Sequence, residues 1–146
     1  MNKAKSRTSL VLMELIITIL FFSLASAVCV QLFVRAYLTT NETRELNNAI
    51  NITQSISEVM NGTDGSLKSV KEYFKNAEGD SNYFVVYYDA DFNETADIDT
   101  AVYAADVTTT RVGNLYNMNI DFLKLSDYDE IYSLKSSKYI RKIYNN

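Results

Sequence analysis

An apolar segment near the N-terminus dominates the hydrophobic pattern of the chain. From Leu15 to Val34 there is no charged side chain. A helix of that length rises about 30 Å, which is enough to cross the hydrocarbon core of a bilayer. Glu14 stands directly before this segment, and Lys3, Lys5 and Arg7 precede it. Because a carboxylate at the edge of such a span is costly to bury, Glu14 is a candidate functional residue.

The helical period continues beyond the apolar segment. Apolar or small residues recur at three- and four-residue spacing, and Asn61-Gly62 is a stop signal. The residues on this face are Leu46, Ala49, Ile50, Thr53, Ile56 and Met60. We therefore expect one helix from Leu10 to about Met60, with a loop near Thr39-Thr40-Asn41 as the alternative. Residues 10–36 would lie in a membrane or filament, and residues 37–61 would be the exposed amphipathic half.

Residues 62–146 predict a small α+β head. Ser66 is a candidate N-cap for a short helix, Leu67–Ala77, whose apolar residues share a face. Four strands follow, with a turn at Gly113-Asn114: Tyr83–Tyr88, Ala101–Thr110, Tyr116–Phe122 and Asp129–Leu134. A basic tail spans Lys138–Tyr144. Short connections favour an antiparallel meander packed against the long helix, so the predicted fold class is α+β.

Composition and charge exclude several classes of function. The chain has 14 basic and 18 acidic residues, so it lacks the basic footprint of nucleic-acid binding. It has no histidine, which removes the commonest general base and metal ligand. Its one cysteine, Cys29, lies in the apolar segment and cannot form an internal disulfide. Without a nucleophile–base pair or a phosphate loop, we expect neither an enzyme nor a firmly bound cofactor.

The acidic loop that begins at Asp89 is a candidate calcium site. Its oxygen donors alternate as in an EF-hand, but Glu94 takes the glycine position and Thr100 that of the final glutamate. The loop therefore departs from the EF-hand pattern. A looser calcium site built from Asp89, Asp91, Asp97 or Asp99 is one interpretation, and a solvated acidic loop is the other.

The N-terminus has three interpretations. Ala25-Ser26-Ala27 fits the small-x-small pattern of a cleaved secretory signal, although Val28–Val34 continues the apolar run past that point. A permanent single-pass anchor explains the length, and the basic leader favours a cytoplasmic N-terminus. A processed assembly helix also explains Glu14 and the small residues that let neighbouring helices approach closely, which are Ser23, Ala25, Ser26 and Ala27.

Ser9-Leu10-Val11-Leu12-Met13-Glu14, followed by the apolar helix, resembles the class III signal of type IV prepilins and pseudopilins. In that family a short basic leader is cut before an apolar residue, and glutamate stands fifth in the mature chain. The resemblance implies a leader of residues 1–9, cleavage between Ser9 and Leu10, and N-methylation of Leu10. Ser9 replaces the preferred glycine, and Leu10 the usual phenylalanine. Ser23 and Gln31 replace the glycine and proline of major pilins, which favours a minor pilin or pseudopilin.

The resemblance also implies a function and a location. The chain would be a structural subunit of a type IV pilus, type II secretion or DNA-uptake apparatus. Its partners would be other pilin or pseudopilin subunits, the prepilin peptidase/methyltransferase, the inner-membrane assembly platform and, before assembly, membrane lipid. It would span the cytoplasmic membrane once, with the N-terminus cytoplasmic and the head outside, and then enter an extracellular filament.

Assembly gives Glu14 a specific task. Packing such helices side by side would bury its carboxylate, and a buried charge is tolerated only beside an opposite one. The free amine that cleavage creates at Leu10 of a neighbouring subunit would supply that charge. The alternative function is a permanently anchored extracytoplasmic binding module without a filament role. A cleaved, secreted β-rich domain is third.

Overall fold

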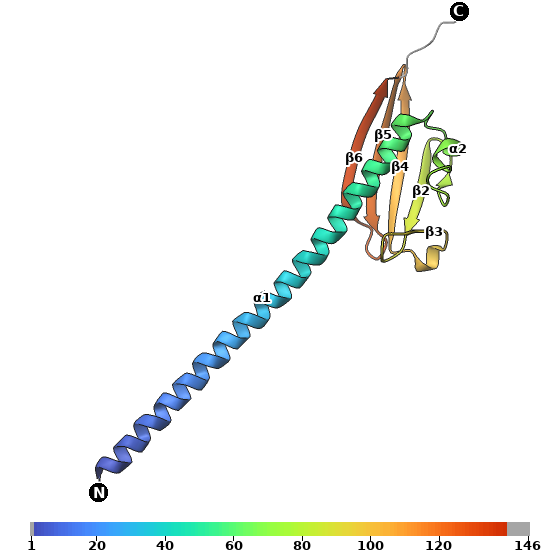
Figure 1. Ribbon diagram of the computed structural model, residues 1–146. Coiled ribbons are helices and arrows are strands. Elements are labelled where there is room, and N and C mark those ends of the chain that lie inside the picture. Colours follow the sequence, from blue (N-terminus) through green and yellow to red (C-terminus); the bar gives the residue numbers. More distant parts are fainter. Residues whose placement is uncertain (1, 140–146) are drawn as a thin grey trace, which may run out of the picture. The chain divides into compact units, whose positions relative to one another are not determined.

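A single long helix forms the N-terminal part of the protein. The computed structural model describes residues 2–139, with side chains from Thr8 onward. The helix, α1 (Asn2–Gly62), runs from blue to green in Figure 1. The predicted helix from Leu10 to Met60 is confirmed, and the chain stays helical through Thr39-Thr40-Asn41. It begins before Leu10 because residues 2–9 contain neither glycine nor proline, the two residues that most disfavour a helix interior.

The described chain divides into two compact units between Thr43 and Arg44. The second unit, called the head below, contains the last turns of α1 from Arg44, a one-turn helix α2 (Leu67–Val70), a 3-10 turn η1 (Ile98–Thr100) and one antiparallel sheet. The strands of the sheet are β1 (Glu78–Gly79), β2 (Tyr83–Tyr88), β3 (Glu94–Thr95), β4 (Tyr103–Val112), β5 (Leu115–Lys124) and β6 (Asp129–Tyr139).

The four long strands form the predicted antiparallel meander. β2, β4, β5 and β6 lie side by side in chain order (Figure 1). β1 and β3 pair with opposite ends of β2, along the edge that β4 leaves free. Each of these two short strands has only two residues, which is too short for a sequence pattern to reveal. The α+β fold class is therefore confirmed: one long helix packs against a small antiparallel sheet.

Several predicted boundaries were wrong. The helix expected over Leu67–Ala77 ends at Val70, because the amides of Glu72 and Tyr73 bond to carbonyls only three residues earlier. Its apolar residues still reach the core: Val70 and Ala77 are buried. Strand β4 lies two residues later than predicted, and β5 is longer at both ends. Strand β6 continues to Tyr139, five residues past the predicted end at Leu134.

The core lies between the last turns of α1 and one face of the sheet. α1 contributes Ala49, Thr53, Ile56 and Met60, all fully buried, which confirms most of the predicted helical face. Leu46, at the start of that face, is still 41% exposed. Alternate residues of the strands complete the core, as period-two burial requires: Phe84, Val86, Tyr88, Tyr103, Ala105, Val107, Met118, Ile120 and Phe122.

Gly79 allows the backbone of β1 to lie very close to that of β2. Its φ of +131° is a conformation that only glycine adopts readily, and an added Cβ would lie 2.3 Å from Tyr83 O. We expect Gly79→Ala to lower the free energy of unfolding of the head by about 2–3 kcal/mol, because backbone must move to admit the methyl group. Urea denaturation followed by tyrosine near-UV circular dichroism measures this loss.

Gly62 provides the matched control for Gly79. It ends α1, and an added Cβ at Gly62 would meet nothing within 4 Å. Gly62→Ala should therefore change stability by no more than about 1 kcal/mol, in the stabilising direction. Equal losses for the two variants would show that the close approach at Gly79 is not what constrains that position.

Candidate functional site: the apolar helix and its acidic end

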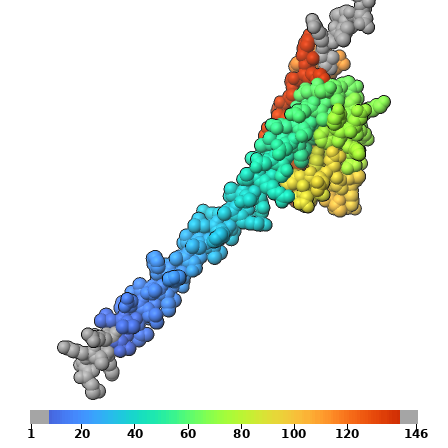
Figure 2. Space-filling model, viewed as in Figure 1, coloured from blue at the N-terminus to red at the C-terminus, as the bar shows by residue number. Residues whose placement is uncertain are grey.

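The apolar part of α1 presents its side chains outward on every side. All side chains from Thr8 to Arg44 are exposed, including large ones such as Phe21, Phe22 and Phe33 at 71–78%. Figure 2 shows this part, in blue and cyan, as a single rod of side chains. Within Thr8–Gly62 the helix is long and apolar enough to cross a membrane. So large an exposed apolar surface requires a lipid or protein environment, since water would disfavour it.

Glu14 is the only charged residue between Thr8 and Val34. It lies one helical turn after Leu10, so the two residues share a face of α1. Among the described side chains, residues 8–139, none forms a hydrogen bond or an ion pair with the Glu14 carboxylate. That carboxylate is therefore free to pair with a group from another molecule.

The predicted cleavage position, Ser9–Leu10, lies inside the helix. α1 begins at Asn2, so this peptide bond is flanked by helical residues on both sides. A peptidase that attacks an extended backbone must first unwind this turn. Processing at Ser9 and methylation of Leu10 stay predictions.

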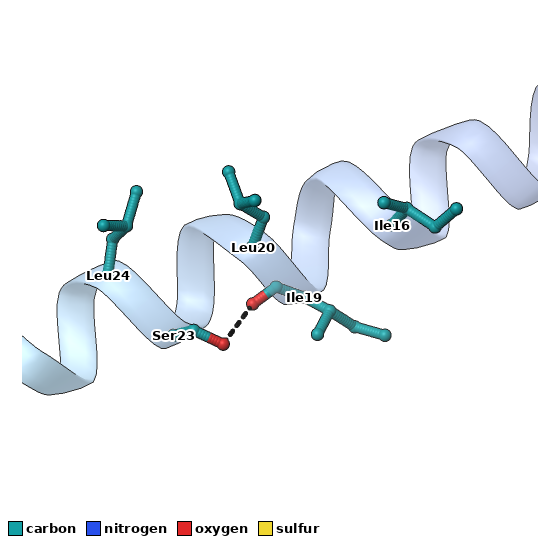
Figure 3. Close-up of a pocket in the computed structure, with 5 residues that line it drawn as sticks. All are labelled: Ile16, Ile19, Leu20, Ser23 and Leu24. Atoms are coloured by element: carbon teal, nitrogen blue, oxygen red, sulfur yellow. Dashed lines mark hydrogen bonds between the residues drawn. The ribbon is translucent and has the colours of Figure 1, made fainter.

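Polar residues of the apolar segment satisfy their hydroxyl groups within the helix. Thr18 donates to Glu14 O, Ser23 to Ile19 O and Ser26 to Phe22 O, each at 2.8 Å. Such bonds to the carbonyl four residues earlier remove the cost of placing a hydroxyl in hydrocarbon. Figure 3 shows the Ser23 bond beside Ile19, with Leu20 and Leu24 projecting from the other side of the ribbon. A shallow depression lined by Ile16, Ile19, Leu20, Ser23 and Leu24 results.

That depression suits another helix better than a small ligand. One helix cannot enclose a molecule, and four of the five lining residues are aliphatic. Ser23 is the one small residue of its lining, where a neighbouring backbone can approach closely. The lining of this depression is therefore of the kind that packs against a neighbouring helix.

The acidic loop after β2 forms local turns. The Asp89 carboxylate accepts hydrogen bonds from Asp91 N and Asn93 N, and these bonds hold its pKa below the ordinary value, with Asn93 contributing most. The Asp97 carboxylate accepts from Asp99 N at the start of η1. Among the described residues, no group of three or more acidic, histidine or cysteine side chains lies close enough to hold a metal ion. The calcium site stays a prediction without such a cluster to support it.

A second group of polar side chains joins this loop to the head's part of α1. Glu45 accepts hydrogen bonds from Lys124 Nζ at 2.7 Å and from the Tyr103 hydroxyl at 2.9 Å. The Phe92 ring stacks on Tyr103, with 4.7 Å between centroids, and the Arg44 guanidinium lies 5.6 Å from the Phe92 centroid. We call Arg44, Glu45, Phe92, Tyr103 and Lys124 the clamp. Its contacts hold Phe92 at φ +64°, a left-handed conformation that a bulky residue rarely adopts.

Sequence reasoning missed the clamp. Glu45 and Lys124 are separated by 79 positions, and no local pattern links them. Phe92 interrupts an otherwise polar loop, which was the one available signal. The clamp fixes where the acidic loop lies in the head and is therefore structural.

The clamp predicts a specific pH dependence of stability. Partial burial raises the pKa of Glu45, but hydrogen bonds from Lys124 and Tyr103 outweigh it, so the folded pKa lies below 4.5. As the pH falls below 4.5, the unfolded chain therefore binds more protons than the folded chain. The stabilisation that Glu45 provides is lost as the pH falls through its folded pKa. The hydrogen bond to Glu45 raises the pKa of Lys124. The contribution of Lys124 to the stability of the folded chain is therefore present below pH 10.5 and is lost as the pH rises through its folded pKa.

We expect Glu45→Gln to lower the free energy of unfolding by about 1 kcal/mol at pH 7, because it removes a partly exposed ion pair. The difference from the unchanged chain should be smaller at pH 3, because the Glu45 carboxylate takes up protons as the pH falls below 4.5. Urea titrations at both pH values measure it. Glu58→Gln is the control, since Glu58 is an exposed carboxylate on the same helix. A loss at pH 7 that persists undiminished at pH 3 would exclude the charge of Glu45 as its cause.

Comparison with known proteins gives no match. No protein-family model, no curated protein and no solved structure matches this chain. The class defined by the structure is therefore an α+β protein with a long apolar N-terminal helix. Any narrower assignment rests on the chemistry of its own residues.

Proposed function

We propose that this chain is a pilin-like structural subunit, a minor pilin or pseudopilin of a type IV pilus, type II secretion or DNA-uptake apparatus. The observation that carries the proposal is the apolar helix itself. Its segment from Leu15 to Val34 is uncharged and exposed on all sides, and Glu14, whose carboxylate has no partner among the described side chains 8–139, stands at its end. A simple anchor has no use for that carboxylate, whereas a bundle of identical helices does.

Charge pairing supplies the mechanism of assembly. Cleavage before Leu10 leaves an ammonium group one turn from Glu14. In a bundle, Glu14 of one subunit pairs with the Leu10 amine of its neighbour, because both charges are then away from water. The pair forms at one axial offset and therefore sets the register between subunits. The Ser23 face lets the helices approach closely enough for this pairing.

Membrane orientation follows from the leader. Lys3, Lys5 and Arg7 favour a cytoplasmic N-terminus, so the head lies on the outer side of the cytoplasmic membrane. The peptidase/methyltransferase and the assembly platform are separate proteins that act on α1 before the subunit leaves the lipid. The alternative, a permanently anchored binding module, shares this orientation but never leaves the membrane.

Cell fractionation separates these two functions. Filaments sheared from cells and pelleted apart from membranes should contain this chain if it is a filament subunit. A periplasmic pseudopilus is captured instead by cross-linking intact cells and finding ladders of the chain with other subunits. Recovery solely as an uncross-linked monomer in the membrane fraction would support the anchored module and refute the filament role.

A further inference from the structure

The outer face of the sheet, turned away from α1, carries a hollow of about 370 Å³. Tyr83, Tyr87 and Tyr128 line it, and Val85 and Ala104 are nearly buried among its lining residues. Asp106 is the one charged residue in the lining. An aromatic hollow with a single carboxylate is suited to an organic cation, because ring faces and carboxylates both attract positive charge.

Among residues 8–139 no cation pairs with the Asp106 carboxylate, whose side-chain partner is the Tyr83 hydroxyl, a hydrogen-bond donor without charge. In the sheet register it stands opposite Val85 on β2 and opposite Asp121 on β5. Like charges at directly opposite positions repel. Asp121 is held by Ser133 Oγ and Asn119 Nδ2, both at 2.6 Å. Among residues 8–139 the ion pairs are Arg44–Asp91 and Lys124–Glu45, and neither involves this pair of carboxylates.

Tyr128 lines the hollow in a backbone conformation that is strained for a bulky residue. It closes the turn between β5 and β6 with φ +57°, a conformation that favours glycine. Its side chain is 75% exposed, so core packing does not account for its presence. The turn thus presents an aromatic ring to solvent at the rim of the hollow.

We propose that this hollow binds the cationic segment Ile140–Ile143 of a second copy of the chain, through Arg141 or Lys142. These two are the only adjacent basic residues in the sequence, and isoleucines flank them. The cationic groups match Asp106 and the tyrosines, and the isoleucines match the aliphatic residues beside them. The net negative charge of the head also favours binding of a basic segment, since residues 44–139 contain 16 acidic and 8 basic residues.

The segment cannot reach the hollow of its own head. Tyr139 pairs with Leu115, whereas Asp106 in the hollow stands opposite Asp121, which pairs with Ser133, about 20 Å back along β6. Arg141 and Lys142 follow Tyr139 by two and three residues, so backbone and side chain together reach at most about 17 Å. The contact is therefore between copies. It does not depend on the filament proposal, because two heads can meet in any arrangement of the anchors.

Binding of a peptide to single copies of the full chain tests the proposal. The chain is placed in nanodiscs at one copy per disc, and a labelled peptide of residues 138–146 is titrated by fluorescence anisotropy. We expect saturable binding that weakens with added salt. Asp106→Asn should weaken it about tenfold, and Glu72→Gln, an exposed carboxylate outside the hollow, should leave it unchanged. A peptide with Arg141→Glu and Lys142→Glu should not bind.

Tyr128→Gly distinguishes binding from folding. Glycine suits φ +57°, so this variant should unfold at the same temperature or higher while binding the peptide several-fold more weakly. A merely structural role for Tyr128 predicts no loss of affinity in a chain that is equally stable. The proposal is overturned if the peptide fails to bind the unchanged chain, if Asp106→Asn binds it equally well, or if the glutamate-substituted peptide binds as tightly.

Discussion

Replacing Glu14 with glutamine is expected to leave membrane insertion unchanged and to reduce the recovery of this chain in filaments at least about tenfold. Glutamine keeps the size of the side chain but removes its charge. In the proposed bundle the Leu10 amine of the neighbour then lies buried without a counter-ion, and breaking a buried pair costs about 3–5 kcal/mol. Insertion into lipid does not use the pair, since the charge lies at the edge of the span.

The measurement is quantitative immunoblotting of sheared filaments and of membranes from the same cells. Glu42→Gln is the matched control, because Glu42 is an exposed carboxylate on the same helix, beyond the uncharged segment. Both variants should reach the membrane in equal amounts. Normal incorporation of Glu14→Gln would remove the pairing role and leave Glu14 as a residue that simply extends toward the lipid–water interface.

Phe122→Ala is expected to lower the free energy of unfolding of the head by about 3–5 kcal/mol. Phe122 is fully buried on the inner face of β5. Its ring stacks on Tyr103 at 5.7 Å and lies tilted against Tyr88 at 5.9 Å, so truncation leaves a cavity between two aromatic neighbours. A domain of this size is stable by about 5–15 kcal/mol, and the loss is therefore a large share of the whole.

Thermal and urea unfolding of the full chain in detergent, followed by tyrosine near-UV circular dichroism, measures this loss. Tyr73→Ala is the control, because Tyr73 is an aromatic residue of the head that is 61% exposed, and its removal should cost less than about 0.5 kcal/mol. Comparable losses for the two variants would contradict the placement of the core between α1 and the sheet.

Local pattern was sufficient wherever one physical effect acted alone. β2 was predicted at its observed bounds, Tyr83–Tyr88, because six aromatic and β-branched residues stand between polar turns. The buried face of α1 was predicted from its period, and Met118, Ile120 and Phe122 of β5 are buried as their alternation required. The turn at Gly113 takes φ +64°, as a glycine before asparagine suggested.

Prediction failed where tertiary contacts decide the outcome. Leu67–Ala77 has helical spacing, yet the chain leaves the helix after Val70 while its apolar residues still pack on the core. β6 runs past Leu134 through a polar stretch, Lys135 to Lys138, which is held by pairing with β5 and not by hydrophobic alternation. Lys138 donates to Asn61 O in the last turn of α1 and to Thr63 O just after its end. No local sequence pattern around Lys138 predicts these hydrogen-bond partners.

The candidate site divides in the same way. Glu14 and the apolar helix are local in sequence, so their placement was predicted from charge and length. The clamp around Glu45 and the hollow around Asp106 each combine residues that are far apart in the sequence, and only the tertiary fold brings them together. The role of Ser9 and Leu10 depends on an event, cleavage, that chemical analysis of the mature chain must establish.

Mass spectrometry of the N-terminus of the protein purified from native membranes or filaments tests the central claim most directly. The account predicts a chain that begins at Leu10 with a methylated α-amine, since the pairing with Glu14 needs that amine. A chain that begins at Met1 would identify a permanent anchor, and one that begins at Val28 a cleaved secretory signal. Either of those results would contradict the assembly function.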